Sequence, residues 1–314
     1  MHPEPIFRIF GQGVYLYGIC FALGVIACFG FLMFTMWYKK FSETSSNAII
    51  FIGIIATAFG ALSGMIFQGI YDVIEGKEFS LNGMTFIGGL IGGVVSFLAI
   101  WNLYVFVIRP HTKIKALKGE MNAGLCDALP FIPIGIAIAH AFGRFGCFWG
   151  GCCYGIEVEW GLPCAAYSTK NVMPTQLFEM SFLIILAVVM AVMYFKFKLN
   201  YNFAVYSIGY GIFRFIIEYY RADDRGELIG QISPSQFWGI VMVILGIVYI
   251  VVQYFYLAKL MKHPENSVEV EIIEADGEIV ASACQAVEAL LKTEESGAVT
   301  PVEKTNKKSR KGKE

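Results

Sequence analysis

Seven long apolar stretches limit what this chain can fold into more than any other feature of its sequence. A helix that crosses the hydrocarbon core of a bilayer needs about 20 mostly apolar residues. Of the 314 residues, 56% are hydrophobic and 16% are charged, whereas a soluble domain is about 45–50% apolar. The sequence therefore predicts an all-α integral membrane protein with seven transmembrane helices. We expect these helices at about residues 14–37, 48–70, 86–108, 127–143, 175–195, 203–220 and 234–257.

The charges between these stretches predict how the chain is oriented in the membrane. Basic residues follow the first, third, fifth and seventh stretches, as Lys39 and Lys40 follow the first. The other loops are acidic or mixed. Because the cytoplasmic loops of membrane proteins are enriched in lysine and arginine, we expect the N-terminus outside and the C-terminus in the cytoplasm.

The composition changes after the seventh stretch, and this change predicts two regions. Residues 1–260 are expected to form the membrane domain. Residues 261–314 contain an acidic run, "EVEIIEADGE", and a basic end, "KTNKKSRKGKE", which is typical of a disordered tail and here a cytoplasmic one. The net charge of the chain is −1, so the bulk charge indicates no nucleic-acid partner.

Arg214, Glu218 and Arg221 place charge in the sixth apolar stretch, within "YGIFRFIIEYYR". Residues three and four apart lie on one face of a helix, and ionisable groups within a membrane span usually face the protein interior. Two interpretations stay open. One is a salt-bridged stripe that fixes helix packing, and the other is an anion site, because a guanidinium group matches the geometry of phosphate.

The stretch "GMTFIGGLIGG", residues 83–93, repeats glycine four residues apart, as at Gly89 and Gly93. This spacing lets helices approach closely, so we expect a packing seam. Room for a bulky ligand is the alternative. Gly60 and Gly64 predict a second seam of the same kind.

Arg144 lies in the most unusual segment, "GRFGCFWGGCCYG", residues 143–155. Its five glycines argue against a continuous helix, so we expect a loop that dips into the bilayer. Backbone of that kind must be buried in protein or line a cavity. Pro174 and Thr175 are expected to begin the next helix.

Cysteines gather in and after this segment. They are Cys147, Cys152, Cys153 and Cys164. Three interpretations stay open: a zinc site, a disulfide on an oxidising outer face, or packed free thiols. The spacing from Cys147 to Cys152 suits zinc, but a second well-spaced pair is missing, and we expect no metal. His140 could serve a thiol nucleophile as its base, but its position in an apolar stretch favours a buried polar group.

The predicted topology brings four of these features to one level of the membrane. They are Tyr17 at the start of the first stretch, the glycines of 83–93, the segment 143–155 and the charged end of the sixth stretch. Such a site in the outer leaflet, with two or three arginines, suits an anionic phospholipid headgroup.

Five motifs, taken in order, resemble the prolipoprotein diacylglyceryl transferase family. They are "LYGIC" at 16–20, "GMTFIGGLIGG", "GRFGCFWGGCCYG", "PTQLFE" at 174–179 and "YGIFRFIIEYYR". The resemblance covers about residues 10–257. It implies transfer of the diacylglyceryl group of phosphatidylglycerol, a membrane lipid, to the lipobox cysteine of preprolipoprotein signal peptides. It also implies a multi-pass protein of the bacterial plasma (inner) membrane that needs no metal or nucleotide cofactor.

The resemblance assigns roles to individual residues. Arg144 and Arg214 match the two essential arginines of the family and are the expected catalytic residues. The expected substrate-binding residues are Tyr17, Gly155, Glu218, Arg221, Cys147 and Cys152. Glu218 is expected to orient the arginines.

Three positions depart from the family pattern. Cys147 stands where the family typically has asparagine, Cys152 where it has glutamate, and Ile87 where many members have histidine. Because isoleucine cannot accept a proton, the sequence identifies no general base. A non-catalytic lipid-binding or lipoprotein-chaperoning relative is therefore the alternative function. A transporter is a third, weakened by the lack of inverted repeats.

Overall fold

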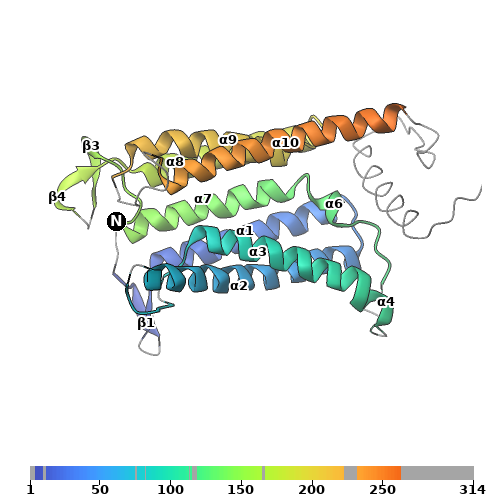
Figure 1. Ribbon diagram of the computed structural model, residues 1–314, viewed down its shortest axis with the longest axis horizontal. Helices are drawn as coiled ribbons and strands as arrows, with labels where there is room; N and C mark the ends of the chain where they lie inside the picture. Colours follow the sequence, from blue (N-terminus) through green and yellow to red (C-terminus); the bar gives the residue numbers. More distant parts are fainter. Residues whose placement is uncertain are drawn as a thin grey trace, which may run out of the picture. The chain divides into compact units, whose positions relative to one another are not determined.

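The computed structural model describes residues 4–9, 12–74, 76–81, 83–112, 114, 119–164, 167–222 and 232–262. Long helices dominate this part of the chain (Figure 1). They are α1 (Leu16–Tyr38), α2 (Glu43–Ile74), α3 (Phe86–Asn102), α7 (Ile132–Gly150), α8 (Thr175–Phe195), α9 (Asn202–Ile217) and α10 (Pro234–Lys262). The shorter helical elements are η1 (Leu103–Ile108), a π-helix that continues α3, then α4 (Arg109–His111), α6 (Leu125–Ala128) and the 3₁₀ turn η2 (Glu218–Tyr220).

Six helices of the described residues are long and apolar enough to cross a membrane. Large apolar side chains point out of the fold, as Ile26 and Trp37 on α1 do with 66% and 74% of their surface exposed. Such exposure over a whole helix is favourable only against lipid. The chain is therefore a multi-pass membrane protein. The stretch expected at 203–220 forms α9 and η2, but α9 has only 16 residues, so the count of seven spans stays a prediction.

Helix α7 occupies the centre of the bundle and contacts α1, α8 and α9. Its beginning supplies Phe131 and Ile134 to a core that also contains Leu183 and Met190 of α8. Each of these four side chains is at most 1% exposed. The position of α7 matters for function because Arg144 lies on this helix.

The glycines of α2 and α3 face one another. A Cβ atom at Gly60 would lie 2.9 Å from the carbonyl oxygen of Gly89, and one at Gly64 would lie 3.0 Å from that of Thr85. Larger residues at these positions would force the helices apart. The predicted packing seam is therefore confirmed, and the two predicted glycine pairs belong to the same seam.

The expectation of a loop at residues 143–155 is wrong for its first half. Helix α7 continues to Gly150 and ends at Gly151, which has the left-handed φ of 67° that glycine adopts readily. A helix satisfies its own backbone groups where water is scarce, so it persists through glycine in a membrane protein. The fourth span also begins later than expected, at Ile132, and Pro133 lies in the first turn of α7, where proline is favourable.

Two short antiparallel hairpins were not expected in an all-α fold. Strands β1 (Phe7–Ile9) and β2 (Gln12–Val14) form one, and β3 (Glu157–Cys164) and β4 (Tyr167–Val172) form the other. The second hairpin connects α7 to α8. It ends at α8, which begins at Thr175 as predicted.

The chain divides into two units, Met1–Tyr256 and Leu257–Glu314. All the contacts described below lie in the first unit. The cytoplasmic tail expected at 261–314 lies outside the described residues after Lys262, so the predicted division into domains stays a prediction.

Candidate functional site

Arg144 lies inside the bundle, where a carboxylate holds it. Its Nε lies 3.0 Å from Oε1 of Glu179 on α8, and the two side chains are 14% and 1% exposed. Nη2 of Arg144 donates a hydrogen bond to the hydroxyl of Tyr210 on α9 at 3.4 Å, and that hydroxyl donates to Glu179 at 2.6 Å. His140, one turn before Arg144, accepts a hydrogen bond from its Nε at 3.4 Å. Three helices therefore fix one guanidinium group.

Arg214 and Arg221 share a second carboxylate, Glu218. Oε2 of Glu218 lies 3.0 Å from Nη2 of Arg214 and 3.7 Å from Nε of Arg221. Its other oxygen accepts a hydrogen bond from Ser233 at 2.8 Å, and Ser235 accepts one from Arg214 at 2.6 Å. Both arginines thus form ion pairs with Glu218, as the interpretation of a salt-bridged helix face expects. All three side chains are less than 10% exposed.

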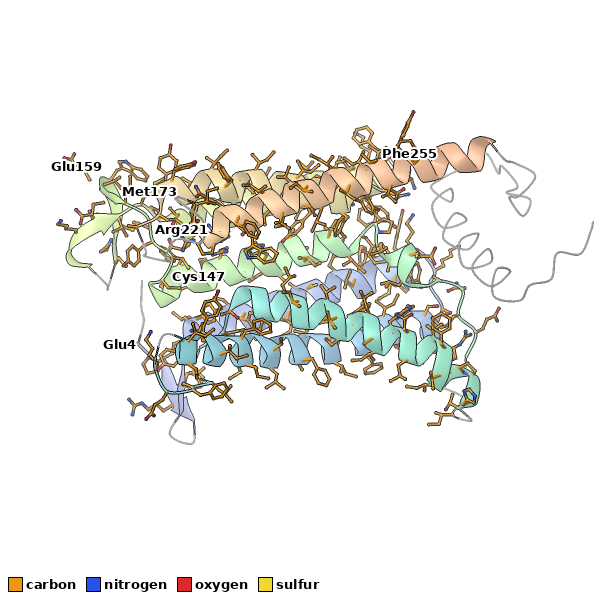
Figure 2. All side chains as sticks on the ribbon, in the orientation of Figure 1. Glu4, Cys147, Glu159, Met173, Arg221 and Phe255 are labelled. Atoms are coloured by element: carbon orange, nitrogen blue, oxygen red, sulfur yellow. The ribbon has the colours of Figure 1, made fainter. Side chains whose placement is uncertain are left out.

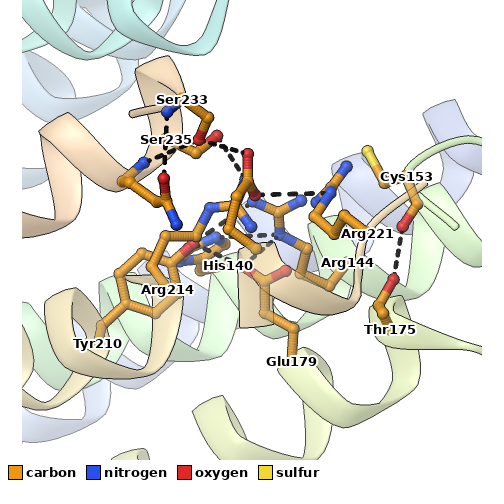
Figure 3. A network of polar contacts seen from close by, with 12 residues as sticks. His140, Arg144, Cys153, Thr175, Glu179, Tyr210, Arg214, Arg221, Ser233 and Ser235 are labelled. Carbon is orange, nitrogen blue, oxygen red and sulfur yellow. Dashed lines mark hydrogen bonds and ion pairs between the residues drawn. The ribbon is translucent and has the colours of Figure 1, made fainter. Parts of the chain in front are cut away.

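These two groups lie close together and form one polar network. Figure 3 shows Arg144, Arg214 and Arg221 beside one another, with Glu179 below them. Three guanidinium groups share two carboxylates in the described part of the network. Nη1 of Arg214 is buried and has no hydrogen-bond partner among the described residues. A buried donor without a partner is costly, and an anionic ligand would satisfy it.

Gly155 connects the segment after α7 to the end of α9. It forms an isolated β-bridge with Arg221, and its amide donates to the carbonyl oxygen of Met173 at 2.9 Å. A Cβ atom at Gly155 would lie only 2.6 Å from the carbonyl oxygen of Tyr220. Because Gly155 has no side chain, the segment after α7 can approach the end of α9. This approach places Arg221 in the network.

Tyr17 approaches the same end of α7 from α1. A Cβ atom at Gly146 would lie 3.2 Å from the ring and from the carbonyl oxygen of Tyr17, so a glycine of the signature segment makes room for the tyrosine. The Tyr17 side chain is 43% exposed. It can therefore contact a bound lipid without leaving its helix.

Cys147 and Cys152 lie beside this site and gather with Cys153. Their sulfur atoms all lie within 4.8 Å of one another, and the cysteines that the structure describes form no disulfide. Hydrogen bonds from Cys147 and Cys152, together with the nearby guanidinium groups of Arg221 and Arg144, hold the pKa of the Cys153 thiol well below its ordinary value. Cys164 is buried apart from this group, and its thiol donates to the carbonyl oxygen of Gly151 at 3.6 Å.

The predicted residues from three segments therefore meet near one end of the bundle, where Figure 2 labels Cys147, Met173 and Arg221. The glycine-rich segment 83–93, also expected at this level, packs against α2. Ile87 lies in α3, but its side chain is outside the described residues.

Comparison with known proteins identifies the family. A family model described as prolipoprotein diacylglyceryl transferase matches residues 4–252. The chain belongs to this family. Curated proteins named phosphatidylglycerol–prolipoprotein diacylglyceryl transferase are similar to it. The one from Clostridium tetani is 29% identical over 77% of this chain and 94% of its own length. The one from Finegoldia magna is 30% identical over 83% of this chain and 98% of its own length.

Membership of the prolipoprotein diacylglyceryl transferase family makes this chain a transferase by family. The site also contains residues to which we assigned no role from the sequence, chiefly Glu179 and Tyr210. Glu179 ends the motif "PTQLFE" and lies in the first half of an otherwise apolar span. A lone carboxylate there requires a cationic partner, and this signal could have found it. Tyr210 has no comparable signal, because tyrosine is common in membrane helices.

Proposed function

We propose that this chain transfers the diacylglyceryl group of phosphatidylglycerol to the lipobox cysteine thiol of preprolipoproteins. The observation that carries the proposal is the buried three-arginine network, in which Nη1 of Arg214 has no hydrogen-bond partner among the residues that the structure describes. Three guanidinium groups gather there around two described carboxylates, and a guanidinium group matches the planar geometry of a phosphodiester headgroup. The names of the relatives from Clostridium tetani and Finegoldia magna support the same substrates.

The reaction proceeds by displacement at carbon. The thiol sulfur attacks the glycerol carbon of the diacylglyceryl group that is bonded to the phosphate oxygen. A C–S bond forms while that C–O bond breaks, and glycerol phosphate leaves with the electron pair. The thiol proton passes to the leaving phosphate, whose second pKa is about 6. The atoms and charges therefore balance without a histidine at position 87.

Arg144 and Arg214 stabilise the charge that develops on the leaving phosphate. Preorganised positive charge in a site with little water is among the strongest catalytic effects. Glu179 and Glu218 hold the two guanidinium groups in place before the substrate arrives. Arg221, placed through Gly155, adds a third positive charge.

Tyr17, Cys147 and Cys152 border the headgroup in this proposal. Tyr17 supplies a half-exposed aromatic face, and the lipobox peptide approaches past it. The site lies in the outer leaflet of the bacterial plasma membrane, which the seven helices cross with the N-terminus outside and the C-terminus in the cytoplasm. The alternation of basic loops supports this orientation.

A complementation experiment tests the proposal in cells. The chain is expressed in bacteria depleted of their own transferase, and lipidation of a reporter lipoprotein is followed by its change in mobility and by lipid labelling. We expect lipidation by the wild type and by Arg8→Ala, which changes an exposed arginine of β1, but not by Arg144→Ala or Arg214→Ala. Failure of a well-folded wild type would contradict the proposal.

A non-catalytic lipid-binding relative is the second candidate, and Ile87 favours it because many members of the family have histidine there. The same residues would then bind phosphatidylglycerol without cleaving it. Measurement of lipid binding and glycerol phosphate release on one preparation separates the two functions.

A further inference from the structure

Three thiols lie beside the arginine network, and the transfer reaction gives none of them a chemical step. They belong to Cys147, Cys152 and Cys153, and their sulfur atoms lie within 4.8 Å of one another. Cys152 is exposed and the other two are half-buried. The group is thus open to an ion from one side.

The end of α7 folds back so that these thiols meet. Cys147 lies in the last turn of the helix, and the amide of Cys152 donates to its carbonyl oxygen at 3.3 Å. Gly151 and Cys153 both have left-handed backbone, with φ of 67° and 63°. Such a conformation is uncommon for a residue with a side chain, so the turn holds Cys153 at a cost that other contacts must offset.

Helix α8 supplies those contacts. Nε2 of Gln176 donates to the carbonyl oxygen of Cys152 at 2.5 Å. The hydroxyl of Thr175 donates to the carbonyl oxygen of Cys153 at 2.7 Å, as Figure 3 shows. Both donors come from the first turn of α8. The backbone that carries two of the thiols is therefore anchored from outside the turn, as the backbone of a preorganised ligand site must be.

The distances and the number of sulfurs match a thiophilic ion. Three sulfur atoms that each lie about 2.3 Å from a metal lie about 4 Å from one another. The three sulfur atoms here lie within 4.8 Å of one another, so small side-chain rotations bring them to that separation. Thiolates select soft ions such as Cu(I) and Zn(II). Zinc in structural sites takes four protein ligands, and the described residues bring only three together here. Cu(I), by contrast, can be coordinated by three thiolate ligands alone.

The neighbouring charges favour the complex. Three thiolates and one Cu(I) ion carry two negative charges. Arg144 precedes Cys147 by three residues on α7 and so shares its helix face, and the backbone of Arg221 pairs with Gly155, two residues after Cys153. Positive groups on both sides can therefore compensate the charge.

We infer that Cys147, Cys152 and Cys153 bind one Cu(I) ion as a three-thiolate site. The inference does not rest on the proposed transferase activity, and either can fail without the other. It replaces the expectation from the sequence that this segment binds no metal, which rests on the lack of a second well-spaced cysteine pair for a four-ligand zinc site.

The test uses the full-length protein in detergent, reduced and free of metal, with Cu(I) supplied from its coloured bicinchoninate complex under reducing conditions. We expect the wild type to take up one Cu(I) per chain. Cys152→Ser, which changes an exposed thiol, should weaken the uptake at least 10-fold. Cys126→Ser is the matched control, because Cys126 lies on α6, before the start of α7, and this variant should bind as the wild type does.

A footprint on the wild-type chain makes the result independent of how the variants fold. Alkylation followed by peptide mass spectrometry should show that Cu(I) protects Cys147, Cys152 and Cys153 and leaves Cys126 reactive. Uptake by Cys152→Ser equal to that of the wild type, or no protection of the three thiols, would overturn the inference. So would stoichiometric retention of Zn(II) in competition with Cu(I).

Discussion

Glu179 on α8 holds Arg144 on α7 through an ion pair of 3.0 Å that is almost wholly buried. The same carboxylate oxygen accepts a hydrogen bond from Tyr210 on α9. One acid therefore joins three helices and fixes the arginine of the signature segment. Removing one partner of a buried pair leaves an uncompensated charge, which is far more damaging than losing a pair on the surface.

Glu179→Gln should destabilise the protein and inactivate it. The glutamine keeps the shape but not the charge, so Arg144 is left buried without its counter-ion, at a cost of about 3–5 kcal/mol. Thermal unfolding in detergent measures the change. The control is Glu157→Gln, because Glu157 pairs with Lys170 on the exposed hairpin β3–β4, where the loss should be about 0–1 kcal/mol. Equal effects of the two changes would contradict the assigned importance of the buried pair.

Arg214→Lys should fold but lose activity. Lysine preserves the charge, yet a single ammonium group cannot contact Glu218, Ser235 and a phosphate in the planar arrangement of a guanidinium group. We expect kcat to fall about 100-fold, as when one preorganised donor is removed, with a smaller change in the KM for phosphatidylglycerol. The release of glycerol phosphate gives both constants. A KM effect alone would show that Arg214 only binds the lipid.

Tyr210→Phe tests the hydroxyl that links Arg144 to Glu179. Phenylalanine keeps the ring and removes a donor to the carboxylate and an acceptor from the guanidinium group. Because hydrogen bonds to charged groups contribute about 1.5–3 kcal/mol, the melting temperature should fall measurably. Tyr249→Phe on α10 removes a hydroxyl that accepts a hydrogen bond from the neutral amide of Gln253, so it should have less effect.

Gly155→Ala should separate the segment after α7 from the end of α9. The added Cβ atom would lie 2.6 Å from the carbonyl oxygen of Tyr220, and overpacking of this kind costs about 1–3 kcal/mol. Activity should fall with stability, because the bridge to Arg221 is disturbed. Gly143→Ala is the matched control, since a Cβ atom there meets open space among the described residues. Its unfolding temperature should stay within error of the wild type.

The sequence predicted the helices better than the site. Apolar length alone placed each of the long helices to within several residues, because a membrane span depends on little else. The glycine seam between α2 and α3 followed from a spacing of four, which has a direct geometric meaning on a helix.

The local form of the signature segment could not be predicted in the same way. Glycine disfavours a helix in soluble proteins, but the glycines of α7 leave room for neighbours, as Gly146 does for Tyr17. The spacing of four residues on a helix placed Arg214 and Glu218 on one face, and the two form an ion pair. No such spacing indicates the partner of Arg144. Glu179 is 35 positions away along the chain, and only the packing of α7 against α8 brings the two together.

The transfer of a diacylglyceryl group by this chain can be measured on the purified protein, reconstituted in vesicles that contain phosphatidylglycerol and supplied with a synthetic lipobox peptide. Mass spectrometry of the peptide and an assay of glycerol phosphate are performed on the same sample. We expect a diacylglyceryl thioether on the cysteine and release of glycerol phosphate in equal amount, both abolished in Arg214→Ala. A folded protein that binds phosphatidylglycerol but yields neither product would contradict it.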